Sequence, residues 1–133
     1  MNGLKIGITN KEEMVVTYEF LASQGGSGTL DVFGTPFMIA FMELAALHCV
    51  SPYLPETETT VGTNINVNHI APCTTGDKVY FTATLKEIAG NRLLFDVRAR
   101  TKDYEIGYGT HERFIVNSEK FLKKLQETLN KNK

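Results

Sequence analysis

The hydrophobic and polar positions of this 133-residue chain follow two different periods. Residues 36–50 are apolar almost without interruption, which predicts a helix buried nearly all round. Thr35 and Pro36 form a typical helix start, with threonine as the N-cap and proline at the first helical position. Because Pro52 closes the run, we expect one long helix from Thr35 to about Val50.

Alternation of apolar and polar residues replaces that pattern further along the chain and is typical of strands with one buried face. It predicts strands over residues 59–71, 78–86, 93–100 and 105–116, separated by short turns. In the first of these strands, Gly62 and three asparagines fall on one face, and the other face carries Val61, Thr63, Ile65, Val67 and His69.

The two ends of the chain add less regular elements. Residues 14–20 are rich in strand formers, and residues 24–29 form a Gly/Ser-rich loop without the Gly-Lys-Ser/Thr ending of a phosphate-binding loop. Asn117 or Ser118 caps a short final helix. Short turns give an antiparallel sheet whose concave face the long helix fills, so residues 1–133 are predicted to form one α+β domain.

Charge and composition narrow the range of partners. The 14 basic and 15 acidic residues give a net charge of −1, which argues against a nucleic-acid-binding surface. The apolar run is shorter than the roughly 20 residues of a membrane span, and no basic-then-apolar leader opens the chain. Two cysteines and three histidines lack the spacing of a metal site. We therefore expect a cytoplasmic protein with no membrane partner and no metal.

Glu43 is the first candidate for chemistry, because it interrupts the apolar helix. A carboxylate in such a place pairs, neutralises or reacts, since its desolvation costs several kcal/mol. His69 lies in phase with the apolar residues of its strand, and a carboxylate can orient an imidazole near neutral pH. The alternatives are a hydrogen-bonded structural role for Glu43 and a satisfied core position for His69.

Thr35 is a third candidate, although its position also suits a plain N-cap. Eight residues separate it from Glu43, which corresponds to about 12 Å of helical rise. A direct bond between the two side chains is therefore not expected, and they more naturally flank a bound substrate. The free N–H groups of the first helical turn favour a polarised oxygen there.

Three segments together resemble a known family. They are residues 32–38 with Met42-Glu43, residues 61–63 with 67–69, and residues 105–107 with the Gly-Thr-His-Glu-Arg run of 109–113. Over roughly residues 5–121 the chain is similar to the fluoroacetyl-CoA thioesterase family of hotdog-fold proteins. The resemblance implies a long central helix wrapped by a curled antiparallel sheet, a short C-terminal helix, and a homodimer with active sites at the subunit interface.

The resemblance also implies roles for individual residues. Thr35, Glu43 and His69 match the family's catalytic threonine, glutamate and histidine. Gly62 matches the glycine whose backbone N–H faces the thioester carbonyl, where a close approach is needed. Arg113 matches an arginine near the cofactor side and is a candidate for binding a CoA phosphate, with an ordinary surface arginine as the alternative.

The chain departs from the family in the segment before the helix. The fluoroacetyl-selective member places phenylalanines there that gate the acyl pocket, whereas this chain has Thr29 and Gly26. Phe33 and Leu30 are the apolar residues left to bind the acyl group. The resemblance therefore implies thioesterase chemistry without the gate that selects fluoroacetyl-CoA.

The expected activity is hydrolysis of a short-chain acyl-CoA to a free acid and CoA, with no cofactor beyond the CoA of the substrate. Glu43, with His69, either activates water or attacks the carbonyl to form an anhydride. Thr35 either orients the substrate or water or supplies a nucleophilic hydroxyl. Two other functions suit the same scaffold: a non-catalytic acyl-CoA-binding module, and a hotdog hydratase or dehydratase.

Overall fold

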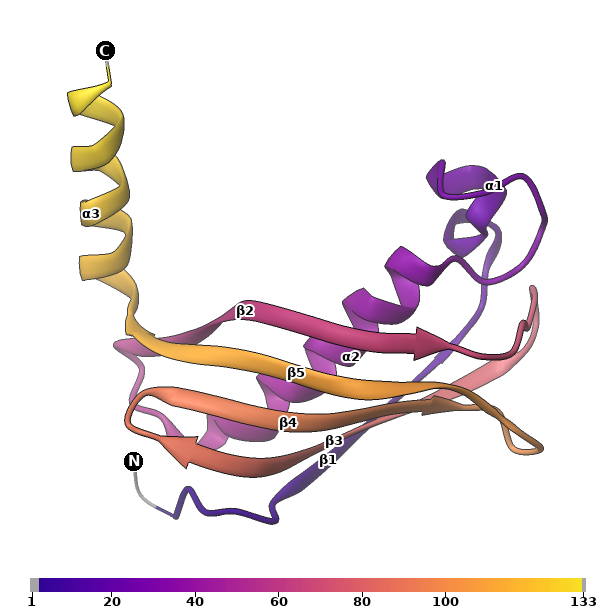
Figure 1. The fold of residues 1–133 in the computed structure, drawn as a ribbon, viewed down its shortest axis with the longest axis horizontal. Helices are drawn as coiled ribbons and strands as arrows, with labels where there is room; N and C mark the ends of the chain where they lie inside the picture. Colours follow the sequence, from indigo (N-terminus) through magenta and orange to yellow (C-terminus); the bar gives the residue numbers. More distant parts are fainter. Residues whose placement is uncertain (1–2, 133) are drawn as a thin grey trace.

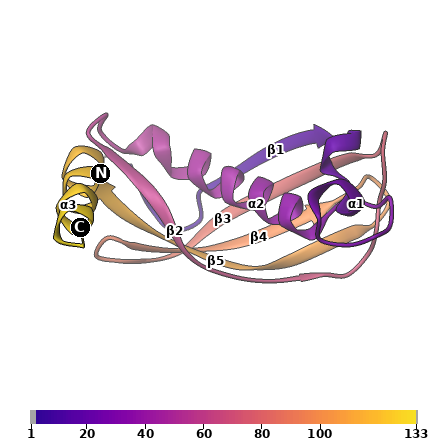
Figure 2. The same ribbon diagram turned by 90° about the horizontal axis from the view of Figure 1, so that it is seen from above.

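The computed structural model describes residues 3–132, which form one antiparallel sheet with a long helix lying across it (Figures 1 and 2). The strand order is β1-β3-β4-β5-β2. The strands are β1 (Thr9–Val15), β2 (Glu58–His69), β3 (Lys78–Ala89), β4 (Arg92–Arg100) and β5 (Glu105–Asn117). The helices are α1 (Ala22–Gly25), α2 (Thr35–Val50) and α3 (Ser118–Lys131), with 3-10 turns at Tyr18–Phe20 and Ser51–Tyr53.

The core lies between α2 and the central strands. The alternation predicted for β3 and β4 is confirmed, since the inward residues of both strands are fully buried. They are Val79, Phe81, Ala83, Leu85, Leu93, Phe95, Val97 and Ala99. These side chains meet Met38, Met42, Ala45, Ala46, Cys49 and Val50 of α2, so Cys49 is a packed core residue.

The helical stretch Thr35–Tyr53 is 19 residues long, which makes it long and apolar enough to cross a membrane by length and composition alone. In this fold the stretch is the core helix, because its buried side packs against the sheet. On its other side Ala40 is exposed and Ile39, Leu44 and Leu47 are only half-buried, so the prediction of a helix buried nearly all round was wrong.

The N-terminal strand prediction was wrong in its position. Residues 9–15 form β1, whereas Tyr18–Phe20 forms a 3-10 turn. β1 is a polar edge strand that pairs with β3 from Thr9 to Val15. The position of β1 is therefore set by backbone pairing with β3 and not by the strand propensity of its residues.

The start of α2 also differs from the prediction. Gly34 is the N-cap residue, and Thr35 is already the first residue of the helix. The Thr35 hydroxyl is consequently not used as a cap and is available for a contact outside the helix.

A bulge in β2 changes which side chains face α2. The register between β2 and β5 shifts between Gly62 and Asn64, so Thr63 is the extra residue. Before the bulge, a Cβ on Gly62 would lie 2.8 Å from Glu43 Oε2 of α2. After it, His69 reaches Thr35 of α2. Gly62 and His69 therefore share the α2-facing side, and the strict alternation that separated them was wrong.

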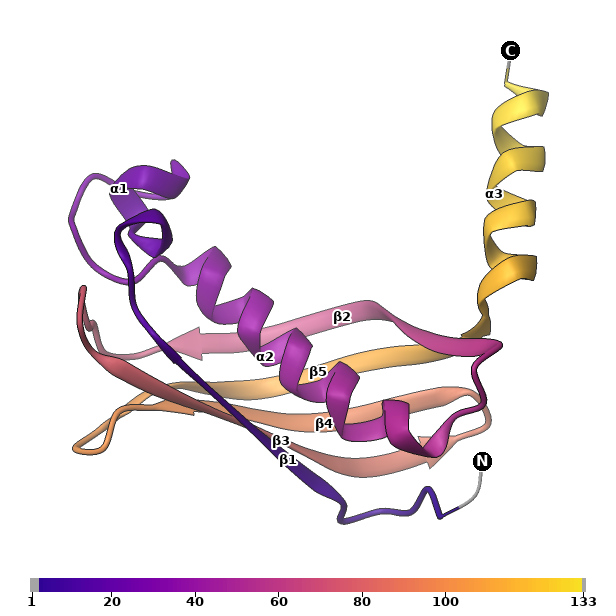
Figure 3. The same cartoon turned by 180° about the vertical axis from the view of Figure 1, so that it is seen from behind.

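The C-terminal helix projects away from the sheet (Figure 3). Asn117 is its N-cap, and the side-chain oxygen accepts a hydrogen bond from Lys120 N at 3.0 Å. Within the described chain, α3 buries none of its side chains, including the exposed Phe121, Leu122, Leu125 and Leu129.

Candidate functional site

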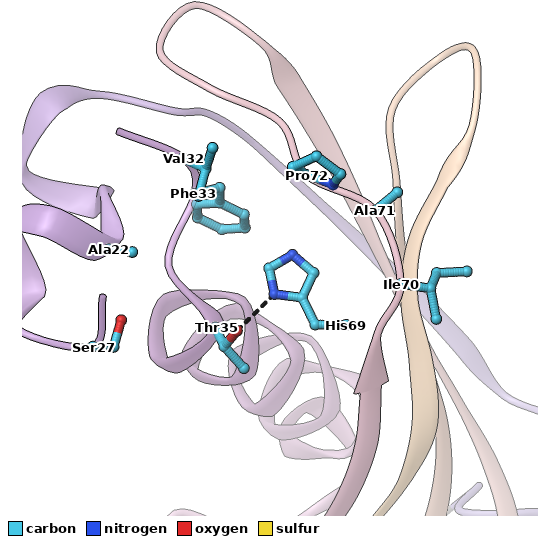
Figure 4. Close-up of a pocket in the computed structure, with 9 residues that line it drawn as sticks. All are labelled: Ala22, Ser27, Val32, Phe33, Thr35, His69, Ile70, Ala71 and Pro72. Carbon is cyan, nitrogen blue, oxygen red and sulfur yellow. Dashed lines mark hydrogen bonds between the residues drawn. The ribbon is translucent and has the colours of Figure 1, made fainter. Parts of the chain in front are cut away.

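Thr35 and His69 form the first part of the site. Thr35 begins α2 and His69 ends β2, and the two elements meet so that Thr35 Oγ1 lies 2.7 Å from His69 Nδ1 (Figure 4). We call this pair the Thr35–His69 half-site. The contact orients the imidazole and leaves its other nitrogen available for chemistry.

That other nitrogen, His69 Nε2, is buried and has no hydrogen-bond partner among residues 3–132. Burial lowers the pKa of His69 below the ordinary value of 6.5, and the nearby backbone of Ala71 opposes the shift. The neutral imidazole is therefore favoured near pH 7, and it can exchange a proton with a bound molecule.

A cavity of about 290 Å³ lies beside this half-site (Figure 4). Phe33 is almost completely buried at its wall, whereas Leu30 is 68% exposed and does not line the cavity. The nine lining residues are Ala22, Ser27, Val32, Phe33, Thr35, His69, Ile70, Ala71 and Pro72. This volume suits a small acyl group.

Glu43 and Gly62 lie in a second group with two residues of β5. Glu43 Oε2 is 3.7 Å from Arg113 Nη1 and 4.0 Å from His111 Nε2. The Glu43 side chain is 39% exposed, so the burial predicted from the apolar run was wrong. We call Glu43, Gly62, His111 and Arg113 the Glu43 half-site. The carboxylate faces a cation on one side and solvent on the other.

Arg113 is buried, with only 6% of its surface exposed, so the alternative of an ordinary surface arginine was wrong. Its Nε donates to Thr60 Oγ1 at 2.7 Å, and its Nη2 donates to the Thr60 carbonyl at 2.9 Å. Burial lowers the pKa of Arg113, and the Glu43 carboxylate opposes that shift. The role in binding a CoA phosphate stays a prediction.

His111 was not among the sequence candidates. It is 1% exposed, and its Nδ1 lies 2.6 Å from the carbonyl oxygen of Asn64. The Gly-Thr-His-Glu-Arg run could have indicated this neighbourhood, because His111 and Arg113 are two residues apart and therefore lie on the same face of a strand. Glu43 is contributed by another element, so this partnership was invisible in the sequence.

The structure does not bring Glu43 and His69 together within one chain. Thr35 and Glu43 are about 12 Å apart along α2, and Gly62 and His69 are about 20 Å apart along β2. The predicted site residues consequently occupy two half-sites at different points of the α2–β2 contact.

Comparison with known proteins identifies the family. A family model described as fluoroacetyl-CoA-specific thioesterase matches residues 16–119. The chain belongs to this family. A fluoroacetyl-CoA thioesterase of Streptantibioticus cattleyicolor is 41% identical over 97 residues, which are 73% of this chain and 70% of that protein. Family membership, predicted from the sequence, is confirmed.

Solved structures agree with the fold. The fluoroacetyl-CoA thioesterase FlK superimposes with a TM-score of 0.88 at 33% identity, over 95% of this chain and 98% of FlK. A hot-dog-like protein from Thermanaerovibrio acidaminovorans gives a TM-score of 0.85 at 24% identity, over 92% of this chain and 91% of that one. The predicted hotdog fold is confirmed.

Proposed function

We propose that this protein is an acyl-CoA thioesterase that hydrolyses short-chain acyl-CoA to a free acid and CoA. Its family supports the reaction class, since relatives are named as fluoroacetyl-CoA thioesterases. The observation that carries the proposal is the Thr35–His69 hydrogen bond beside a cavity of about 290 Å³. The reaction needs no cofactor beyond the CoA of the substrate.

The protein acts as a homodimer in which the two half-sites meet across the subunit interface. β2 is 12 residues long and forms one edge of the sheet, and a long unpaired edge favours pairing with another chain. A two-fold axis at this edge pairs β2 antiparallel with its copy. The Thr35–His69 half-site of one protomer then approaches the partner's Glu43 half-site.

Two features of β2 support one register of this pairing, in which Asn66 lies opposite the partner's Asn66. The first is the outer face, where Asn64 then faces the partner's Asn68 and the asparagines form polar pairs. The second is the bulge. Along the strand, His69 then falls opposite the partner's bulge at residues 62–63. Gly62 shares the α2-facing side with His69 because of that bulge. Strict alternation would have placed the two half-sites on opposite faces of the joined sheet.

In the proposed mechanism, Glu43 takes a proton from water as the water oxygen attacks the thioester carbonyl carbon. The Thr35 N–H at the start of α2 and the Gly62 N–H polarise the carbonyl oxygen, since Pro36 has no N–H and those of Phe37 and Met38 donate to the Gly34 carbonyl. The tetrahedral intermediate then collapses, the C–S bond breaks, and the CoA sulfur takes the proton that Glu43 received, which leaves CoA thiol, the acid and an ionised Glu43. Thr35 and the neutral His69 orient the acyl group and the water at the end of the cavity.

The acyl group is small and not selected for fluorine. The apolar part of the cavity wall includes Ala22, Val32 and the buried Phe33. Thr29 and Gly26, which stand where the selective member has phenylalanines, are exposed in the loop. The protein acts in the cytoplasm, where its cysteines Cys49 and Cys73 remain free thiols.

The test is the release of free thiol from acetyl-, propionyl-, butyryl-, hexanoyl- and fluoroacetyl-CoA. We expect turnover of at least one short chain, with His48→Ala as a control that leaves both half-sites intact. The proposal fails if no acyl-CoA is hydrolysed above background, and tight binding without turnover would favour a binding module. Sedimentation that gives a strict monomer would contradict the interfacial site.

A further inference from the structure

His111 connects the bulge of β2 to Arg113 of the Glu43 half-site. It lies on β5 between the two, with Nδ1 at 2.6 Å from the Asn64 carbonyl oxygen and Nε2 at 3.1 Å from Arg113 Nη1. Its ring is 1% exposed and is tilted against Phe95. The imidazole is therefore held in one orientation by contacts on both of its nitrogens.

These contacts determine where the proton of His111 lies. A carbonyl oxygen only accepts, so Nδ1 must carry the hydrogen that it donates to Asn64. A guanidinium only donates, so Nε2 must be the unprotonated acceptor of the Arg113 N–H. The geometry thus assigns a neutral imidazole in the Nδ1–H tautomer. Burial and the nearby Arg113 charge both lower the pKa of His111, which agrees with this assignment.

Arg113 is fixed by acceptors other than Glu43. Thr60 takes hydrogen bonds from Nε and Nη2, and His111 takes one from Nη1. The Glu43 carboxylate lies 3.7 Å from Nη1, which is beyond the usual range of a direct hydrogen bond. The guanidinium therefore attracts Glu43 without engaging its oxygens in the two-bond arrangement that arginine and carboxylate usually form.

We propose that His111 is a positioning residue for Glu43, because it accepts one of the two Nη1 hydrogens of Arg113 and, together with Thr60, holds the guanidinium 3.7 Å from the carboxylate and out of a direct hydrogen bond. This inference rests on the proposed function, in which Glu43 accepts a proton. A carboxylate bound directly by a guanidinium accepts a proton less readily, since hydrogen bonds to the charged form favour that form. His111 keeps Arg113 close enough to orient Glu43 and leaves both carboxylate oxygens open to substrate and water.

Two substitutions of similar size test the contacts of the two ring nitrogens of His111 separately. His111→Asn places an amide N–H near the position of Nδ1 and retains the bond to Asn64, but it has no acceptor that reaches Arg113. His111→Gln extends further and offers an amide oxygen to Arg113. We expect kcat to fall about tenfold or more in His111→Asn at a KM within about twofold of wild type, and to recover largely in His111→Gln.

A thermal melt of each variant distinguishes positioning from a loss of packing. The proposal is overturned if kcat is unchanged in His111→Asn, or if kcat in the two variants simply follows their Tm values. Nitrogen NMR of histidine-labelled wild-type protein is an independent measurement, and we expect the Nδ1–H tautomer of His111 at pH 7. An Nε2–H tautomer or a cation would contradict the proposal. Because NMR needs no turnover, it remains decisive if acyl-CoA hydrolysis itself is not found.

Discussion

Thr35 Oγ1 lies 2.7 Å from His69 Nδ1, although the two residues are 34 positions apart in the chain. The contact forms because α2 begins where β2 ends, and because Gly34 rather than Thr35 is the N-cap. A hydroxyl freed from capping thus becomes the partner of the histidine that faces the cavity.

His69→Ala is expected to lower kcat by about 10²-fold, because the acyl group and the water lose the imidazole that orients them. The measurement is steady-state thiol release with the best acyl-CoA of the panel. His48→Ala is the matched control, because His48 is half-exposed at the far end of α2 and contacts Glu12 instead of the cavity. Equal activity in the two variants would remove His69 from the mechanism.

Gly62→Ala is expected to reduce kcat more than it reduces stability. The added Cβ would lie 2.8 Å from Glu43 Oε2 and 3.2 Å from His111 Cε1, so the carboxylate has to move. A flexible side chain can yield at little cost to the fold, but the reacting group is displaced. Thr128→Ala on the exposed helix α3, away from both half-sites, is the control. Wild-type kcat in Gly62→Ala would show that the close approach is not needed.

The free energy of unfolding should decrease as pH falls below the ordinary histidine pKa of 6.5. Burial lowers the pKa of His69 and of His111 in the folded chain, so the unfolded chain binds protons first. Their contribution is complete above pH 6.5 and is lost as pH falls toward the lowered pKa values. Urea unfolding at pH 8.0 and 5.5 measures the decrease. It should be smaller in His111→Asn, and an equal decrease there would contradict the assignment.

Acetyl-CoA and fluoroacetyl-CoA should be hydrolysed with kcat/KM values within about one order of magnitude of each other, because the loop places Thr29 and Gly26 where the selective member has phenylalanines. The two substrates are compared in one competition assay. A large preference for fluoroacetyl-CoA would mean that Phe33 or another residue supplies the selection by itself.

Much of the fold was predictable, because the spacing of apolar residues and the turn residues between them indicate helices and strands directly in the sequence. The helix from Thr35 to Val50 and the alternating strands β3 and β4 match their patterns closely. β1 was misplaced because a polar edge strand owes its position to backbone pairing with β3, which local propensity does not contain.

The site was predictable only in part. Thr35, Glu43 and His69 were predicted from their residue types and the family resemblance, and Gly62 from the resemblance alone. Their roles stay predictions, and their grouping into two half-sites was not predicted. The bulge at Thr63 puts Gly62 on the side of His69, and a one-residue insertion of this kind leaves no mark in an alternating pattern. The contact between His111 and the Asn64 carbonyl depends on this bulged strand and on β5 together.

The central claim is that Glu43 of one protomer acts with Thr35 and His69 of its partner. Its most direct test is to unfold and refold Glu43→Gln and His69→Ala together and to measure acyl-CoA hydrolysis. Each variant alone should be nearly inactive. A statistical mixture should regain about one quarter of wild-type activity. About half of its dimers are mixed, and each mixed dimer contains one intact site out of two. Activity equal to the sum of the two separate variants, in a mixture shown to contain mixed dimers, would contradict the account.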